Sequence, residues 1–191
     1  MASQPKPNLT PEEYLAIERA TEFKSEYIDG YIVAMVGASE PHNLIVTNSV
    51  RELSSQLKGR DCTVYSSDMR IDLRERKLFA YPDVVVVCGE PDLVADDFQD
   101  NLRDPVVIIE VLSQSTERYD QGLKFFKYRH IETLEEYVLI AQDRTLIEHY
   151  VRQPSGDWLM SEAFGLDAVI QLRTIGCDLR LSEIYDKVKF P

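Results

Sequence analysis

Two short apolar runs, residues 82–87 and 106–112, constrain the fold more than any other feature of the sequence. Both are rich in Val and Ile, and the second is interrupted only by Glu110. Continuous apolar runs of this length are typical of strands that are covered on both faces. The sequence therefore predicts an α/β fold with a central sheet flanked by helices.

Each apolar run also carries an acid. Asp83 follows Pro82 at the start of the first run, where a strand end could leave it near water. Glu110 has apolar neighbours on both sides, and a carboxylate removed from water is unfavourable unless its charge is neutralised. A single such acid would suggest a buried salt bridge. Two acids on successive core strands favour a shared hard cation, because such ions prefer carboxylate oxygens.

The segments around these runs contain clear start and turn signals. Thr10, Pro11 and Glu13 form a capping box for a first helix that ends near residue 20. Asp29-Gly30 predicts a hairpin between two β-prone runs. Further helices are expected at 41–58, at 117–129 with Ser115 or Thr116 as N-cap, and at 181–185. Strands are expected at 62–66, 69–73, 136–141, 145–151 and 158–163, and an acidic loop at 89–105.

Length and composition limit the class of protein. The 191 residues suit a flexible tail at 1–9 followed by a single domain at 10–191. No apolar run approaches the roughly 20 residues of a membrane helix, and no signal segment is visible, so we expect a cytoplasmic protein without membrane contact. Cys62, Cys88 and Cys177 lie far apart without a CxxC pair, which predicts neither a disulfide nor a cysteine zinc site.

The formal net charge of −12 argues against a protein that coats nucleic acid by bulk attraction, because that binding depends on Lys and Arg. It does not exclude an enzyme in which part of the acidity belongs to a metal site. No dinucleotide, Walker-type, zinc-protease or serine-hydrolase motif is present.

The acids and several segments around them resemble the Uma-two family of restriction endonucleases, within the PD-(D/E)XK nuclease superfamily. The segments that carry the resemblance are Glu26-Tyr27-Ile28-Asp29-Gly30, His42, Ser67-Asp68-Met69-Arg70, Pro82-Asp83-Val84-Val85-Val86, Ile109-Glu110-Val111-Leu112-Ser113, Tyr119-Asp120-Gln121-Gly122-Leu123-Lys124-Phe125 and Glu135-Glu136-Tyr137-Val138. Each segment alone is weak, but they occur in the family's order across most of residues 10–185.

The resemblance implies a restriction-endonuclease-like core with a central mixed sheet and an N-terminal helix and hairpin. It implies a metal-dependent endonuclease, with Asp83 and Glu110 binding Mg²⁺ or Mn²⁺. It also implies a nucleic-acid substrate, most simply DNA, and a homodimer, because cutting a duplex requires two sites.

The chain departs from the superfamily at Leu112, where a catalytic lysine would stand two residues after Glu110. The resemblance moves this role to Lys124 on the following helix, from which a long side chain can return to the sheet. Gly122 would let that helix approach the backbone closely. The alternative is a surface Asp120–Lys124 pair of little energetic value.

Glu26 and His42 complete the expected site. The resemblance places Glu26 beside the metal, and the alternative is an exposed acid at a hairpin strand. His42, in the first turn of the second helix, could contact a phosphate or orient water, although a lone His is more often structural. His130 and His149 are expected to be structural or at the surface, and Asp68 and Arg70 to form a structural pair.

The function expected from these residues is metal-dependent hydrolysis of phosphodiester bonds, with DNA as the expected substrate. A second class stays open: a catalytically inactive module that binds DNA or serves as an assembly subunit in a mobile-element or defence system. The absent lysine after Glu110 and the charge of −12 favour this alternative. A third is an acid–base enzyme that acts on a small molecule with the same carboxylates.

Overall fold

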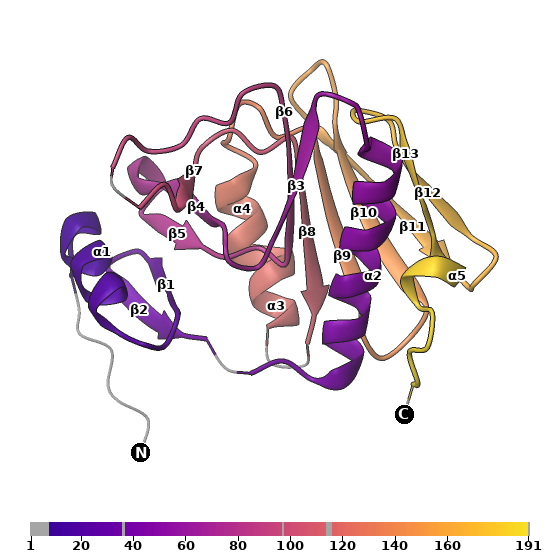
Figure 1. Cartoon of the computed structure of the whole chain (residues 1–191), viewed down its shortest axis with the longest axis horizontal. Helices are drawn as coiled ribbons and strands as arrows, with labels where there is room; N and C mark the ends of the chain where they lie inside the picture. The colour runs from indigo at the N-terminus through magenta and orange to yellow at the C-terminus, as the bar shows by residue number, and fades with distance from the viewer. Residues whose placement is uncertain (1–7, 36, 97, 114–115, 191) are drawn as a thin grey trace.

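The computed structural model describes residues 8–35, 37–96, 98–113 and 116–190 (Figure 1). Its centre is a six-stranded sheet with the strand order β11-β10-β9-β8-β6-β3. The strands are β3 (Cys62–Ser66), β6 (Val84–Cys88), β8 (Val107–Leu112), β9 (Glu136–Ala141), β10 (Leu146–Arg152) and β11 (Trp158–Phe164). Only β8 and β9 run parallel, so the sheet is mixed, which confirms the predicted fold class.

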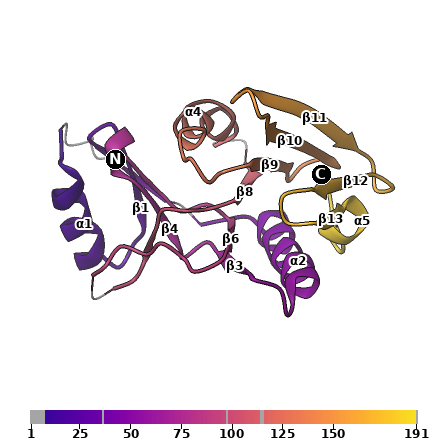
Figure 2. The ribbon, with the colours of Figure 1, turned by 90° about the horizontal axis from the view of Figure 1, so that it is seen from above.

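Helices cover both faces of this sheet, as Figure 2 shows from above. The long helix α2 (Glu40–Leu57) lies on one face, near the β12–β13 hairpin (Val169–Leu172 and Cys177–Arg180) and α5 (Leu181–Ile184). The other face is covered by α3 (Glu117–Tyr119), the π-helical turn η2 (Asp120–Lys124) and α4 (Phe125–Tyr128). Residues 84–87 and 107–112 of the two apolar runs are buried, as strands covered on two faces must be.

A second sheet of five strands lies beside the central one and carries the N-terminal part of the chain. Its order is β2-β1-β5-β4-β7, from β1 (Ser25–Ile28), β2 (Tyr31–Ala34), β4 (Arg70–Leu73), β5 (Leu78–Ala80) and β7 (Asn101–Leu102). The short helix η1 (Arg74–Arg76) joins β4 to β5. The helix α1 (Pro11–Ala20) packs on this sheet through Tyr14 and Leu15.

The start and turn signals of the sequence are confirmed in this region. Thr10 and Glu13 form both hydrogen bonds of the capping box. Asp29 and Gly30 turn the β1–β2 hairpin with positive φ angles of 49° and 90°. The backbone N–H of Leu9 donates to the Gly30 carbonyl, so the end of the expected tail is tied to the hairpin. Residues 1–7 and the proposed cap Ser115 lie outside the described residues.

Several short elements differ from the expectation. The expected loop 89–105 contains β7 and a bridge between Leu93 and Leu102. The strands β5, β12 and β13 were not anticipated. Two to four residues are too few for a periodic pattern, so neighbouring strands decide these elements. Within the described ranges, no helix combines the length and apolar character needed to cross a membrane.

The expectation that the chain lacks a disulfide is wrong. Cys62 and Cys88 face each other across the antiparallel β3–β6 pair, with their Cα atoms 3.9 Å apart, and their sulfurs are bonded. Cys177 is a free, buried thiol. The two cysteines are 26 positions apart in the sequence, and only the register of β3 and β6 brings their thiols together. The sequence alone therefore did not predict the disulfide.

Candidate active site

Asp83 and Glu110 stand opposite each other on neighbouring strands. Asp83 directly precedes β6, and the β6–β8 register pairs Val84 with Ile109, so the next pair outward is Asp83 with Glu110. Opposed residues of an antiparallel pair point to the same face. Asp83 Oδ2 also accepts a hydrogen bond from the Val111 N–H at 2.7 Å, which fixes this carboxylate against β8.

Lys124 returns from the helix to the acids of the sheet. Its Nζ atom lies 3.0 Å from Glu26 Oε1, 3.1 Å from Glu110 Oε1 and 3.4 Å from Asp120 Oδ1. The side chain is buried together with all three carboxylates. The surface Asp120–Lys124 pair is therefore excluded, and the lysine lies where the resemblance expects it.

The helical segment that delivers Lys124 contains a π turn. Residues Asp120–Lys124 follow this wider spiral between two α-helical ends. Such turns are uncommon, and many occur at functional sites. Both ends of the turn, Asp120 and Lys124, are buried and paired with each other, while Gly122 is exposed with no atom near its missing Cβ. The proposed close helix approach at Gly122 is therefore wrong.

Glu26 is a buried member of the cluster and not an exposed hairpin residue. Its Oε1 atom accepts a hydrogen bond from the Tyr81 backbone N–H at 3.1 Å, in addition to the contact with Lys124. Its Oε2 atom accepts the hydroxyl of Tyr119 at 3.2 Å. The hairpin strand β1 thus brings a third acid to the end of the central sheet.

His42 approaches from the opposite face of the sheet, at the start of α2. Ser39 caps this helix by accepting the His42 backbone N–H. The imidazole Nε2 lies 3.0 Å from Asp83 Oδ1, so Asp83 is held by His42 on one oxygen and by Val111 on the other. The histidine of the second helix therefore contacts the first acid directly.

The charges of this cluster are unbalanced. Burial, together with the nearby carboxylates of Asp120 and Asp83, raises the pKa of Glu110 well above its ordinary value, although Lys124 opposes this shift. Burial disfavours the Lys124 ammonium, but Glu110 and Glu26 outweigh that effect and raise its pKa. A deficit of positive charge is what a cation would relieve.

A cavity of about 900 Å³ opens onto these side chains. It reaches from the β2 strand past the N-terminus of α2 to the loop after β9. No three His, Cys, Asp or Glu side chains of the described residues converge as a complete set of metal ligands. The pair Asp83 and Glu110 nevertheless fits magnesium, which is commonly bound by one or two carboxylates with water and substrate phosphate completing its shell.

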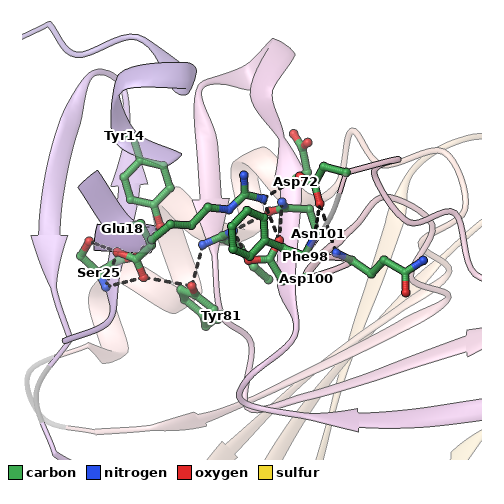
Figure 3. Close-up of polar contacts among 12 residues, drawn as sticks. Tyr14, Glu18, Ser25, Asp72, Tyr81, Phe98, Asp100 and Asn101 are labelled. Carbon is green, nitrogen blue, oxygen red and sulfur yellow. Dashed lines mark hydrogen bonds and ion pairs between the residues drawn. The ribbon is translucent and has the colours of Figure 1, made fainter. Parts of the chain in front are cut away.

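A polar network between α1 and the second sheet holds the residues next to Glu26 and Asp83. Figure 3 shows Glu18, Ser25, Tyr81 and Asp100 of this network. The Tyr81 hydroxyl donates to Glu18 Oε1 at 2.9 Å and accepts from Arg70 Nη1 at 2.7 Å. Glu18 accepts the N–H of Ser25, the residue before Glu26. The network thus fixes the backbone on both sides of the site, because Tyr81 also holds Glu26 and precedes Pro82-Asp83 in the chain.

The sequence did not predict this network, because Arg70 was expected to pair with Asp68. Arg70 instead donates to Asp100 Oδ2 at 2.7 Å and Asn101 Oδ1 at 2.6 Å, and Lys24 pairs with Asp68. Asp100 and Asn101 lie 30 and 31 positions after Arg70, in the segment expected to be a loop, so no local spacing rule predicts these contacts. The contact of Tyr119 with Glu26 was not predicted either, although Tyr119 belongs to a segment that carries the family resemblance.

Comparisons with known proteins identify the family and the fold of the chain. The family model described as "Uma2: Putative restriction endonuclease" matches residues 11–182. The chain belongs to the Uma2 family. The crystal structure of a "putative nuclease belonging to DUF820" from Anabaena variabilis superimposes with a TM-score of 0.74 at 19% identity, over 95% of this chain and 99% of that one. The fold of this Uma2 chain is therefore shared with that protein.

Two relatives of the Uma2 chain in Synechocystis sp. are similar along most of their length. The uncharacterized protein slr1290 is 36% identical over 188 residues, which cover 98% of this chain and 97% of the relative. The uncharacterized protein sll1609 is 39% identical over 163 residues, or 85% and 92% of the two chains. The family model confirms the predicted Uma-two family.

Proposed function

We propose that this Uma2 protein is a metal-dependent endonuclease that hydrolyses phosphodiester bonds, with DNA as the first substrate to test. The observation that carries the proposal is the meeting of Asp83 and Glu110 across neighbouring strands, with Lys124 Nζ 3.1 Å from Glu110, at the wall of a large cavity. Paired acids and a lysine on a nuclease-type fold are the components that phosphoryl hydrolysis requires.

Asp83 and Glu110 would hold the metal, with Glu26 next to them. When bound, Mg²⁺ or Mn²⁺ supplies polarisation of the phosphate and a more acidic water. The site's excess of carboxylates fits such an ion, since its positive charge favours the ionised form of Glu110.

Lys124 and His42 then have distinct roles. The carboxylates keep Lys124 protonated, so it serves by orienting water and by stabilising negative charge on the phosphate, and not by removing a proton. His42 orients Asp83 through Oδ1 while Val111 fixes Oδ2. Glu26 holds the ammonium of Lys124 in place.

The decisive experiment is cleavage of plasmid, linear duplex and single-stranded DNA with Mg²⁺, Mn²⁺ or EDTA. We expect cleavage only with metal, and a loss of at least about 100-fold in Asp83→Ala and Glu110→Ala. Glu162→Ala on the exposed side of β11 is the matched control and should keep full activity. Cleavage that survives both site substitutions contradicts the assignment.

One observation favours the second candidate, an inactive module that binds DNA or serves as an assembly subunit. Three carboxylates already neutralise Lys124, so the cluster could be purely structural. Calorimetry with Mn²⁺ separates the two candidates. Binding that is lost in Asp83→Asn supports the enzyme, and absence of binding supports the module. The expected homodimer is tested by light scattering of the purified protein.

A further inference from the structure

We infer that the nucleic acid bound by this site is single-stranded or locally unpaired, with its bases lying against the exposed face of β2 that borders the cavity. This rests on the proposed nuclease function and names the class of substrate. Two independent observations carry it: the charge of the cavity wall and an apolar stripe that leads into the cavity.

The cavity wall is acidic. Among the described residues, it contains six carboxylate side chains and three Lys or Arg side chains, a formal charge of −3 that a divalent cation would reduce to −1. The carboxylates are Glu26, Asp83, Glu110, Glu117, Asp120 and Asp143, and the basic residues are Lys24, Lys124 and Arg144.

Each basic side chain of the wall already faces an acid. Lys24 pairs with Asp68, and Arg144 pairs with Asp143 at 2.9 Å and with Glu117 at 3.5 Å. Lys124 is held by its three carboxylates. Binding of duplex backbones depends on Lys and Arg that displace counterions, so this wall gives little affinity for a double helix.

The apolar stripe consists of Tyr31, Val33 and Met35. Tyr31 and Val33 alternate along the edge strand β2, and Met35 follows the strand with its backbone N–H donating to the Lys24 carbonyl at 3.0 Å, so the three continue one alternating row. They are 41%, 45% and 37% exposed. Val33 and Met35 line the cavity itself. Ile32, on the other face, packs into the cluster of Tyr14 and Tyr27, so the strand is anchored from behind.

An unpaired strand suits this combination. Its bases present flat apolar faces that can stack on Tyr31 and contact Val33 and Met35, and such contacts tolerate any sequence. Only one phosphate then needs to reach Asp83 and Glu110. In a duplex the bases are stacked inside the helix, and the second backbone would add negative charge beside an already acidic wall.

The test measures binding of the full-length protein to fluorescent oligonucleotides by anisotropy, with Ca²⁺ as the metal. The probes have one 20-nucleotide sequence, prepared as single-stranded DNA, as single-stranded RNA and as duplex DNA. We expect at least one single strand to bind about tenfold or more tightly than the duplex. We expect Kd to rise only weakly with salt, as for about one or two phosphate contacts.

Variants locate the surface. Tyr31→Ser and Met35→Ser should weaken single-strand binding by about tenfold or more, as loss of base stacking does. Leu159→Ser on the exposed face of β11, 61% exposed and remote from the cavity wall, is the matched control and should change nothing. All three positions are exposed, so folding is expected to persist, and circular dichroism checks it.

The outcomes separate this inference from the proposed function. Duplex binding equal to or tighter than both single strands, no binding of any probe, or an equal loss in Leu159→Ser overturns the inference. Cleavage of duplex DNA that is unaffected by Tyr31→Ser and Met35→Ser keeps the nuclease and removes the β2 surface. Single-strand binding that depends on β2, without cleavage in Mg²⁺ or Mn²⁺, keeps the surface and removes the nuclease.

Discussion

Lys124 forms ion pairs with acids from three separate segments, so we expect its substitution to have a large effect on cleavage. Lys124→Met keeps the length of the side chain but leaves Glu26, Glu110 and Asp120 without their shared cation. We expect cleavage to fall at least about 100-fold, because charge stabilisation at the phosphate is lost. Calorimetry should show that Mn²⁺ still binds, since the site has become more negative.

The control for this variant is Lys58→Met at the exposed C-terminal end of α2, which should leave both cleavage and Mn²⁺ binding unchanged. If Lys124→Met keeps normal cleavage, the lysine has only a structural role, and the mechanism must be revised.

Tyr81 contributes through its hydroxyl to the buried network and through its N–H to Glu26. Tyr81→Phe removes only the hydroxyl, which leaves Arg70 and Glu18 each without one hydrogen bond. We expect the free energy of unfolding to fall by about 1–3 kcal/mol in a urea titration. Mn²⁺ affinity should stay within about threefold, because Asp83, Glu110 and the N–H to Glu26 are kept. An unchanged urea midpoint would show that the network adds no stability.

At this residue scale the sequence was most informative about the acids. Asp83 and Glu110 were predictable because charges within apolar strands are costly and therefore require a reason. Glu26, His42 and Lys124 were reached through the family resemblance, since no local rule joins residues that lie 16 to 98 positions apart from one another. The contacts of Arg70 depend on the path of a loop and were not predictable.

The elements of the molecule show a similar division. Capping residues and the Asp-Gly turn predicted α1 and the β1–β2 hairpin, because those signals act within a few residues. The π turn at Asp120–Lys124 has no sequence rule. Here its two ends, Asp120 and Lys124, form an ion pair with each other, and Lys124 also contacts Glu110. The Asp120 carbonyl accepts a hydrogen bond from the Tyr137 hydroxyl at 3.0 Å.

The β3–β6 pair gives a prediction at the level of elements. Its disulfide closes a loop of 26 residues, and such a cross-link stabilises by about 3 kcal/mol, chiefly by restricting the unfolded chain. Cys62→Ser combined with Cys88→Ser should therefore lower the free energy of unfolding by about 2–4 kcal/mol under oxidising conditions. Urea titrations with and without dithiothreitol measure this.

Dithiothreitol should destabilise the original protein and leave the double serine variant unaffected, since that variant has only the buried Cys177. If the reductant changes neither protein, the two thiols are not bonded in solution. Cleavage should be the same in both, because the disulfide joins residues at the ends of β3 and β6 that lie away from Asp83.

At the scale of the whole molecule, the two sheets, the N-terminal end of α2 and the α3–η2 segment surround an acidic cavity. The sequence predicted the mixed central sheet and the nuclease family, because the apolar runs and ordered motifs extend along most of the chain. It did not predict the second sheet as a separate unit, since β5 and β7 are too short to produce a pattern. Neither did it predict how His149 is buried.

His149 lies against Glu136 in the core, with Nε2 2.5 Å from Oε2, and Glu136 Oε1 accepts the Thr174 N–H at 2.7 Å. This ties β9 and β10 to the segment between β12 and β13. Burial alone would raise the pKa of Glu136, but the hydrogen bonds from His149 and Thr174 outweigh it and lower the pKa below 4.5. The contribution to stability is therefore present above pH 4.5 and is lost as the pH falls through the lower, folded-state pKa.

Glu136→Gln tests this dependence. The variant loses the charged hydrogen bond, so its free energy of unfolding at pH 7 should be lower by about 1–3 kcal/mol. Because glutamine does not titrate, the difference between the two proteins should shrink as the pH falls from 5 to 3. Urea titrations across that range measure it, with Glu162→Gln on the exposed face of β11 as the control. A difference that stays constant with pH would show that Glu136 acts through packing and not through its charge.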